Sequence, residues 1–163
     1  MLTRVEQFHQ NGCFISCLAI LLQVSYQEAF KLVHPKRKMP ASDFHQMRRW
    51  KVGMDPEKSL QIMEENGLRV QQSNLRKVSS LRRRTSLILL RWRHEPAQMH
   101  AVVFDGSTGR IIDPSLWPSS REEIQDNLDS VYYVKRRITQ PMARLAKNTS
   151  ALRRADCSLS LAV

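Results

Sequence analysis

The first part of the chain has the hydrophobic pattern of helices. Residues 13–23 form an apolar segment that is too long for a buried strand and rich in helix formers, which predicts a buried helix beginning at or beside Cys13. The sequence Ser25-Tyr-Gln-Glu28 is a capping box and predicts a second helix that continues to about Val33. Two more helices are predicted after it, over 42–50 and 56–66.

The second part of the chain has the shorter period of strands. Apolar runs bounded by turn residues predict strands over 68–70, 86–92, 99–104, 110–113 and 131–134. A hairpin-type turn, Asp105–Gly109, joins two of them, and a second capping box, Ser120–Glu123, predicts a helix ending near Leu128. Helices followed by an antiparallel sheet are typical of the α+β class. This order places Cys13 in the helical part and His100 in the sheet.

The composition is that of an ordinary globular protein, but the charge is strongly basic. The chain has 163 residues, of which 42% are hydrophobic, and a net charge of +11. Residues 135–163 contain seven Lys or Arg and one Asp, and are poor in aromatic residues. We therefore expect one domain over residues 1–135 and a basic extension over 136–163 that is partly disordered or docks on a partner. The excess charge predicts an acidic partner, such as nucleic acid, an anionic membrane surface or an acidic protein.

Several functional classes lack their sequence signals. No apolar run approaches the ~20 residues that span a bilayer, and the N-terminus lacks the uninterrupted apolar core of a signal peptide. The three cysteines have neither a disulfide-framework pattern nor zinc-ligand spacing, so no metal site is expected. Free thiols predict a reducing compartment, the cytoplasm, while export without a cleavable signal peptide stays open. The five glycines form no phosphate-binding loop, and no organic cofactor is implied.

Four residues meet the requirements of thiol-dependent acyl transfer. Cys13 lies at the start of an apolar helix, where the helix dipole and the free N–H groups favour a thiolate. His100 lies in an apolar strand, a rigid place for a general base, and Asp113 follows a short hairpin, from which it can reach the far ring nitrogen of His100. Gln7, six residues before Cys13, is a candidate oxyanion donor together with the Cys13 backbone N–H.

The order of these residues also carries a resemblance. Gln7, Cys13 and an apolar helix, followed by His100, a turn and Asp113, resemble the papain-like cysteine peptidases. Within them the chain is most similar to a small bacterial family that cleaves double-glycine leader peptides from secreted peptides. The resemblance covers roughly residues 5–135 and implies a papain-like fold. It also implies the roles of oxyanion donor, nucleophile, general base and imidazole-orienting group for the four residues, in chain order.

Other residues compete for these roles. Gln10 is a second candidate oxyanion donor, three residues before the nucleophile. His9 is too close to Cys13 in sequence to face it readily, so it is predicted to lie at the surface or the rim of the site. Asp105 competes with Asp113, but it begins a turn beside a glycine, where its side chain is expected to bond the backbone.

Three further features have a structural interpretation that is favoured over a functional one. Cys17 is predicted to be a core residue, because it lies inside the apolar helix. Trp92 and Trp117 are candidate walls of a substrate cleft, although core packing is the commoner role of tryptophan. Arg82–Arg84 and the extension are candidate nucleic-acid contacts, less favoured than solvated segments because neither has the interleaved aromatics of a single-strand binder.

The sequence therefore predicts a cysteine hydrolase that cleaves peptide bonds of a protein or peptide substrate, using a Cys-His-Asp triad and a glutamine oxyanion donor. Two alternatives stay open. A deamidase or acyltransferase, such as an exported effector, would use the same chemistry on the same fold. A catalytically silent module would instead bind an acidic partner or nucleic acid through its basic surface. Where the resembling family has glycine after the nucleophile, this chain has Phe14, so the substrate class is left open.

Overall fold

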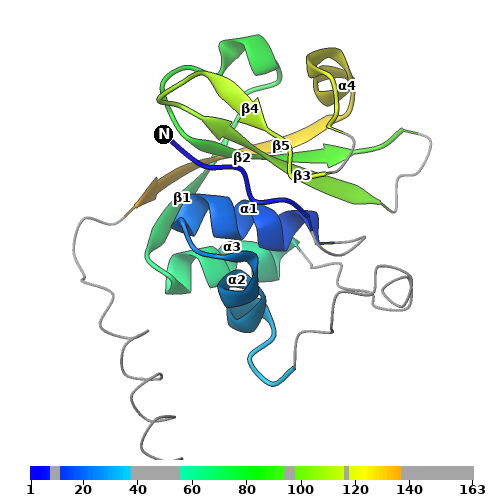
Figure 1. Ribbon diagram of the computed structural model, residues 1–163. Helices are drawn as coiled ribbons and strands as arrows, with labels where there is room; N and C mark the ends of the chain where they lie inside the picture. Colours follow the sequence, from blue (N-terminus) through cyan, green and yellow to red (C-terminus); the bar gives the residue numbers. More distant parts are fainter. Residues whose placement is uncertain (8–11, 38–55, 94–97, 116–117, 137–163) are drawn as a thin grey trace, which may run out of the picture.

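The structure is a computed structural model, and the residues described are 1–7, 12–37, 56–93, 98–115 and 118–136. The helices and strands of these residues follow one another along the chain (Figure 1). They are α1 (Cys13–Leu22), α2 (Tyr26–Val33), α3 (Pro56–Glu65), β1 (Leu68–Ser73), the 3₁₀ helix η2 (Val78–Ser80), β2 (Ser86–Arg91), β3 (Met99–Asp105), β4 (Arg110–Ile112), α4 (Arg121–Asp126) and β5 (Leu128–Arg136). The helix predicted over 42–50 lies outside the described residues.

The strands form one antiparallel sheet in the order β1-β5-β2-β3-β4. Helices α1, α2 and α3 lie on one face of this sheet, and α4 lies on the other (Figure 1). The predicted α+β class, with N-terminal helices followed by an antiparallel sheet, is confirmed.

Burial of both sheet faces explains the uninterrupted apolar run of β2. Leu87 and Leu89 belong to the hydrophobic cluster that includes α1 and α2. Ile88 and Leu90 belong to a second cluster on the opposite face, which includes Ile124 of α4. A strand covered on both faces is continuously apolar rather than alternating, so β2 is the central strand of both cores.

Both predicted capping boxes are present. Ser25 accepts a hydrogen bond from the Glu28 backbone N–H and donates its own backbone N–H to the Glu28 carboxylate. Ser120 and Glu123 repeat the arrangement at the start of α4. These local signals were sufficient to locate the helix starts because each satisfies backbone N–H groups that the helix itself leaves unpaired.

The strands predicted over 68–70 and 131–134 are shorter than the observed β1 and β5. The connection between β1 and β2 contains a 3₁₀ helix that the sequence pattern does not predict. Strands β1 and β5 pair along their length, from Leu68 opposite Arg136 to Ser73 opposite Val131, although much of β1 is polar. In the connection between β1 and β2, η2 forms where a basic connector is predicted, and Val78 is buried in the second cluster. Long-range pairing and burial set these elements, and neither has a local sequence signal.

No single helix within the described ranges is long and apolar enough to cross a membrane. Helices α1 and α2 reach that length and composition only as a pair, and the chain bends by 112° between them.

The carboxyl end of α1 is capped from the last strand. The Arg136 guanidinium, at the end of β5, donates to the carbonyl oxygens of Leu21 and Leu22. Helix α1 has no basic residue in its own last turn. A cation beside these carbonyls complements the negative end of the helix dipole, so Arg136 joins the sheet to the helix that begins at Cys13.

Replacing Arg136 by Gln is expected to lower the free energy of unfolding by about 1 kcal/mol, because the helix end loses its cation and its donors. Urea unfolding measures this change. The neighbouring substitution Lys135→Gln removes the same charge but no such contact, so it is expected to leave stability unchanged or slightly higher. An equal loss in both variants would mean that net charge, rather than capping, is responsible.

Candidate active site

His100 and Asp113 form a buried hydrogen-bonded pair between β3 and the loop after β4. The distance from His100 Nε2 to Asp113 Oδ1 is 2.9 Å, and the exposed fractions of the two side chains are 12% and 3%. The Asp113 carboxylate also accepts backbone N–H groups from Ser115, at 2.8 Å, and from Ser119, at 2.9 Å. With these acceptor sites used, the carboxylate has a fixed orientation toward the imidazole.

The pair changes the pKa of both side chains. Burial by itself lowers the pKa of His100, but hydrogen bonds with Asp113 and Cys13, together with their charges, outweigh it and raise the pKa from 6.5 to about 10. Burial raises the pKa of Asp113, but the hydrogen bond and charge of His100, followed by the N–H groups of Ser119 and Ser115, lower it from 3.8 to about 2. At neutral pH the pair is therefore an imidazolium beside a carboxylate.

The Cys13 thiol lies at the amino end of α1, near enough to His100 to raise the pKa of the imidazole. Cys13 is half-buried, and the N-cap of the helix is Gly12, which has no side chain that could accept from the first N–H groups. No acidic residue lies in its first turn. The thiol therefore lies at the positive end of the helix dipole. Since His100 Nε2 bonds Asp113, Nδ1 is the ring nitrogen left for the thiol.

The segment before α1 brings Gln7 to the same loop as Asp113. The Gln7 backbone N–H donates to Pro114 O at 2.7 Å, one residue after Asp113. The predicted role of Gln7 as an oxyanion donor stays a prediction. The rival donor Gln10 and the neighbouring His9 lie outside the described residues.

Arg4 holds the loop that carries the carboxylate, although no motif in the sequence points to this residue. Its Nε donates to Asp113 O at 2.9 Å, and its terminal nitrogen donates to Ser115 O at 2.6 Å. On the other side of the segment, Ser16 of α1 donates its hydroxyl to Glu6 O at 3.3 Å. Residues 4–7 therefore connect the helix of Cys13 to the loop of Asp113. The contacts of Arg4 and Gln7 with this loop join residues more than 100 positions apart and leave no local motif.

Trp92 lies against the imidazole. Its ring is stacked with that of His100, with centroids 6.4 Å apart and an interplanar angle of 20°. Trp92 therefore lies beside the proposed base, and its prediction as a substrate wall stays untested. Trp117 lies outside the described residues.

Cys17 and Asp105 have the structural positions that the sequence favours. Cys17 is fully buried and donates its thiol to Ala101 O at 3.2 Å, and burial raises its pKa well above the ordinary value. Asp105 accepts from the backbone N–H groups of Leu2 and Ser107, so it supports the β3–β4 turn. The two cysteines of α1 are thereby distinct, since only Cys13 interacts with His100 and is partly exposed.

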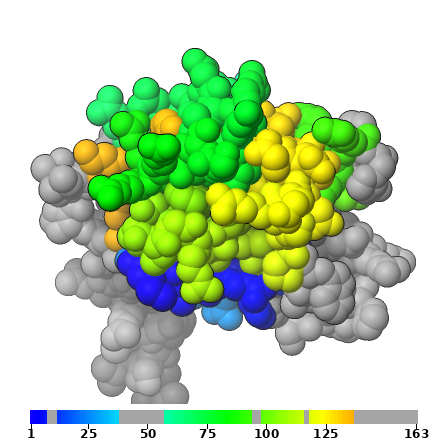
Figure 2. Space-filling view, turned by 90° about the horizontal axis from the view of Figure 1, so that it is seen from above, coloured from blue at the N-terminus to red at the C-terminus, as the bar shows by residue number. Residues whose placement is uncertain are grey.

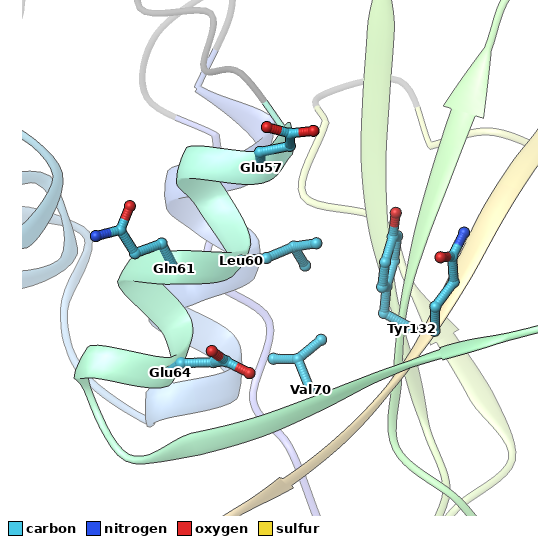
Figure 3. Close-up of a pocket in the computed structure, with 7 residues that line it drawn as sticks. Glu57, Leu60, Gln61, Glu64, Val70 and Tyr132 are labelled. Atoms are coloured by element: carbon cyan, nitrogen blue, oxygen red, sulfur yellow. The ribbon is translucent and has the colours of Figure 1, made fainter.

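A separate pocket of about 360 Å³ lies between α3, β1 and β5, on the side of the sheet away from β3 and β4 (Figure 3). Leu60 of α3 faces Val70 and Tyr132 across it, with Glu57 and Glu64 on the α3 wall. None of the predicted catalytic residues lines this pocket. In the described part of the chain, no group of three or more His, Cys, Asp or Glu side chains is placed to hold a metal ion.

Comparisons with known proteins give a distant structural likeness. No protein-family model and no curated protein matches the chain. Among solved structures, the chain is similar to a double glycine motif protease from an AMS/PCAT transporter, crystallised in complex with the leader peptide. The sequence identity is 17% and the TM-score 0.49, over 84% of this chain and 93% of that one. The case for chemistry therefore rests on the side chains of Cys13, His100 and Asp113.

The replacement Asp113→Asn is expected to lower the His100 pKa from about 10 toward or below 6.5, because burial then acts without the carboxylate. Cys13→Ala is also expected to lower it, since the thiol is the second group that raises the pKa of His100. Titration of the imidazole ring protons by NMR measures both shifts, and circular dichroism checks that each variant is folded.

His34 is the internal control in the same spectra. Burial, followed by the nearby charges of Arg37 and Lys58, lowers its pKa below 6.5, and neither substitution touches it. An unmodified protein in which His100 titrates near 6.5 would contradict the charged pair.

Proposed function

We propose that the chain is a cysteine hydrolase that cleaves peptide bonds with Cys13 as nucleophile and His100 as acid and base. The observation that carries the proposal is the position of the His100 ring, which is hydrogen bonded to a buried carboxylate and lies near enough to the Cys13 thiol for the thiol to raise its pKa. A nucleophile, a base and a group that orients the base are the minimum for this chemistry.

In the proposed reaction Cys13 attacks the substrate carbonyl carbon as a thiolate, beside the protonated imidazole of His100. The tetrahedral intermediate collapses as the C–N bond breaks, and His100 gives its proton to the leaving amine. A thioester with Cys13 remains. Water attacks this thioester with His100 as the base, which releases the acid and restores the thiol–imidazole pair.

Asp113 stays ionised throughout this cycle. Its pKa of about 2 keeps the carboxylate negative at neutral pH, so it stabilises the imidazolium and holds Nε2 while Nδ1 exchanges the proton with Cys13. The N–H groups at the uncapped start of α1 are donors for the negative oxygen of the intermediate, and we propose the Gln7 amide as a second donor.

A peptide substrate is favoured by the order of the motifs. Gln7, Cys13, His100 and Asp113 follow one another as in peptidases that cleave after two glycines. We therefore propose a peptide with small residues before the cleaved bond.

Iodoacetamide is expected to alkylate Cys13 much faster than Cys17, because only the first thiol is partly exposed and paired with an imidazole. His100→Ala is expected to slow alkylation of Cys13 by roughly tenfold or more. Peptide mass spectrometry follows each cysteine separately. His34→Ala, which alters a partly buried histidine outside the site, is the matched control. Slow alkylation of both cysteines, unaffected by His100→Ala, would instead favour the catalytically silent binding module.

Intact mass separates cleavage from deamidation. Two synthetic peptides that both contain a glutamine, one with Gly-Gly and one with Ala-Ala at the same place, are incubated with the protein and with Cys13→Ala. The expected result is a pair of fragments from the Gly-Gly peptide, together heavier than the substrate by one water, about 18 Da. A single product heavier by about 1 Da would identify a deamidase on the same triad.

A further inference from the structure

The excess positive charge of the folded part is concentrated in one segment. The range 67–93 contains eight Arg or Lys and no Asp or Glu. It spans β1, the connection through η2, and β2. Seven exposed cations gather on the face of the sheet that this connection crosses, six from the segment and one from β5, and we call them the basic face: Arg69, Arg76, Lys77, Arg82, Arg83, Arg84 and Lys135. Figure 2 looks onto this side of the molecule, where the green connection lies beside the orange end of β5.

These charges are not neutralised within the described chain. None of the seven side chains forms an ion pair with a described carboxylate. Arg69 and Lys135 are direct partners in the β1–β5 register. Like charges opposite one another on paired strands destabilise a sheet, so this pair opposes folding unless an anion lies between or above the two side chains.

The backbone that carries the arginines is held in place. The Gln125 side chain of α4 bonds both Arg76 O and Val78 N, and Thr85 O accepts the Val134 N–H at 2.9 Å. Gly106 packs so closely on Arg84 that an added Cβ would lie 2.5 Å from its backbone. The basic connector is therefore a fixed part of the surface rather than a solvated linker.

An aromatic ring completes the face. The Arg84 guanidinium lies 5.1 Å from the centre of the Tyr133 ring, which comes from β5. The interleaved aromatic that the connector lacks in sequence is thus supplied by a neighbouring strand. Fixed cations with a stacked aromatic are the features of surfaces that bind single-stranded nucleic acid.

We propose that the basic face binds the phosphate backbone of a single-stranded nucleic acid. Five of its seven cations are arginines, whose planar guanidinium pairs with phosphate through two hydrogen bonds. A strand of acidic peptide added to the edge of β1 would meet only Arg69 among them, since the other six come from the connection and from β5. A membrane would lack an apolar anchor, because the exposed large hydrophobic residue of the described chain is Met1. A polyanion running over the connection meets several cations together.

The test is fluorescence anisotropy of a labelled oligothymidine of about 20 nucleotides, titrated with the full chain at several salt concentrations. The affinity is expected to fall with salt, with a slope of about −0.7 for each phosphate contacted. At about 0.1 M salt, Arg82→Gln with Arg84→Gln is expected to weaken binding roughly fivefold for each cation removed. Lys135→Gln is expected to weaken binding by a similar factor while leaving the urea midpoint unchanged or higher, since it relieves the repulsion from Arg69. If Lys135 had only a structural role, its replacement would lower the affinity and the urea midpoint together.

Three results would overturn the proposal. The first is an equal loss in the control Lys31→Gln with Arg110→Gln, which removes two exposed cations outside the basic face. The second is binding that survives Arg82→Gln with Arg84→Gln but disappears when the basic residues of the extension, Arg144, Lys147, Arg153 and Arg154, are replaced by Gln. The third is stronger binding to polyglutamate or to phosphatidylserine vesicles than to the oligonucleotide at the same salt concentration.

Discussion

The arrangement around Cys13 depends on a buried carboxylate. A charged carboxyl group in the interior is costly unless its oxygens are satisfied, and Asp113 is satisfied by an imidazole and by backbone N–H groups of the loop that follows it. This requirement fixes the loop after β4 and sets the orientation of the His100 ring. It also makes the imidazole basic, because the carboxylate favours its charged form. The chemistry that we propose for Cys13 is therefore a consequence of how a single acidic side chain is accommodated.

The carboxylate and the thiol are far apart in sequence. The amino-terminal segment holds the loop of Asp113 and helix α1 in fixed positions relative to each other. Arg4 bonds the backbone of the Asp113 loop, Gln7 bonds the next residue, and Glu6 receives the hydroxyl of Ser16 in α1. At the opposite end of the same helix, Arg136 bonds the last carbonyls from β5. Helix α1 is thus tied to the sheet at both ends. Small displacements of a nucleophile from its base reduce reactivity strongly, so these distant contacts bear directly on the site.

The parts of the molecule that are predictable from sequence are those with local physical causes. The helix of Cys13 follows from its apolar run, and α2 and α4 follow from capping boxes. The proximity of His100 and Asp113 follows from a hairpin turn whose short length leaves few alternatives. The full length of β1 is hidden because its pairing with β5, and not its own side chains, stabilises it. Arg4 is missed for the same reason, since a bond to a loop over 100 residues away has no periodicity.

The basic face shows that charged residues can be interpreted only when the structure shows which of them are neighbours. Along the sequence Arg69 and Lys135 are separated by 66 positions, so nothing in the sequence alone makes them a pair. The register of β1 with β5 makes them neighbours, and the connection adds Arg84 above Tyr133. Stability alone does not favour like charges at paired positions. Charges that are spread over the surface provide solubility without destabilising the sheet. The opposed cations Arg69 and Lys135 are therefore better explained by an anion that binds to them.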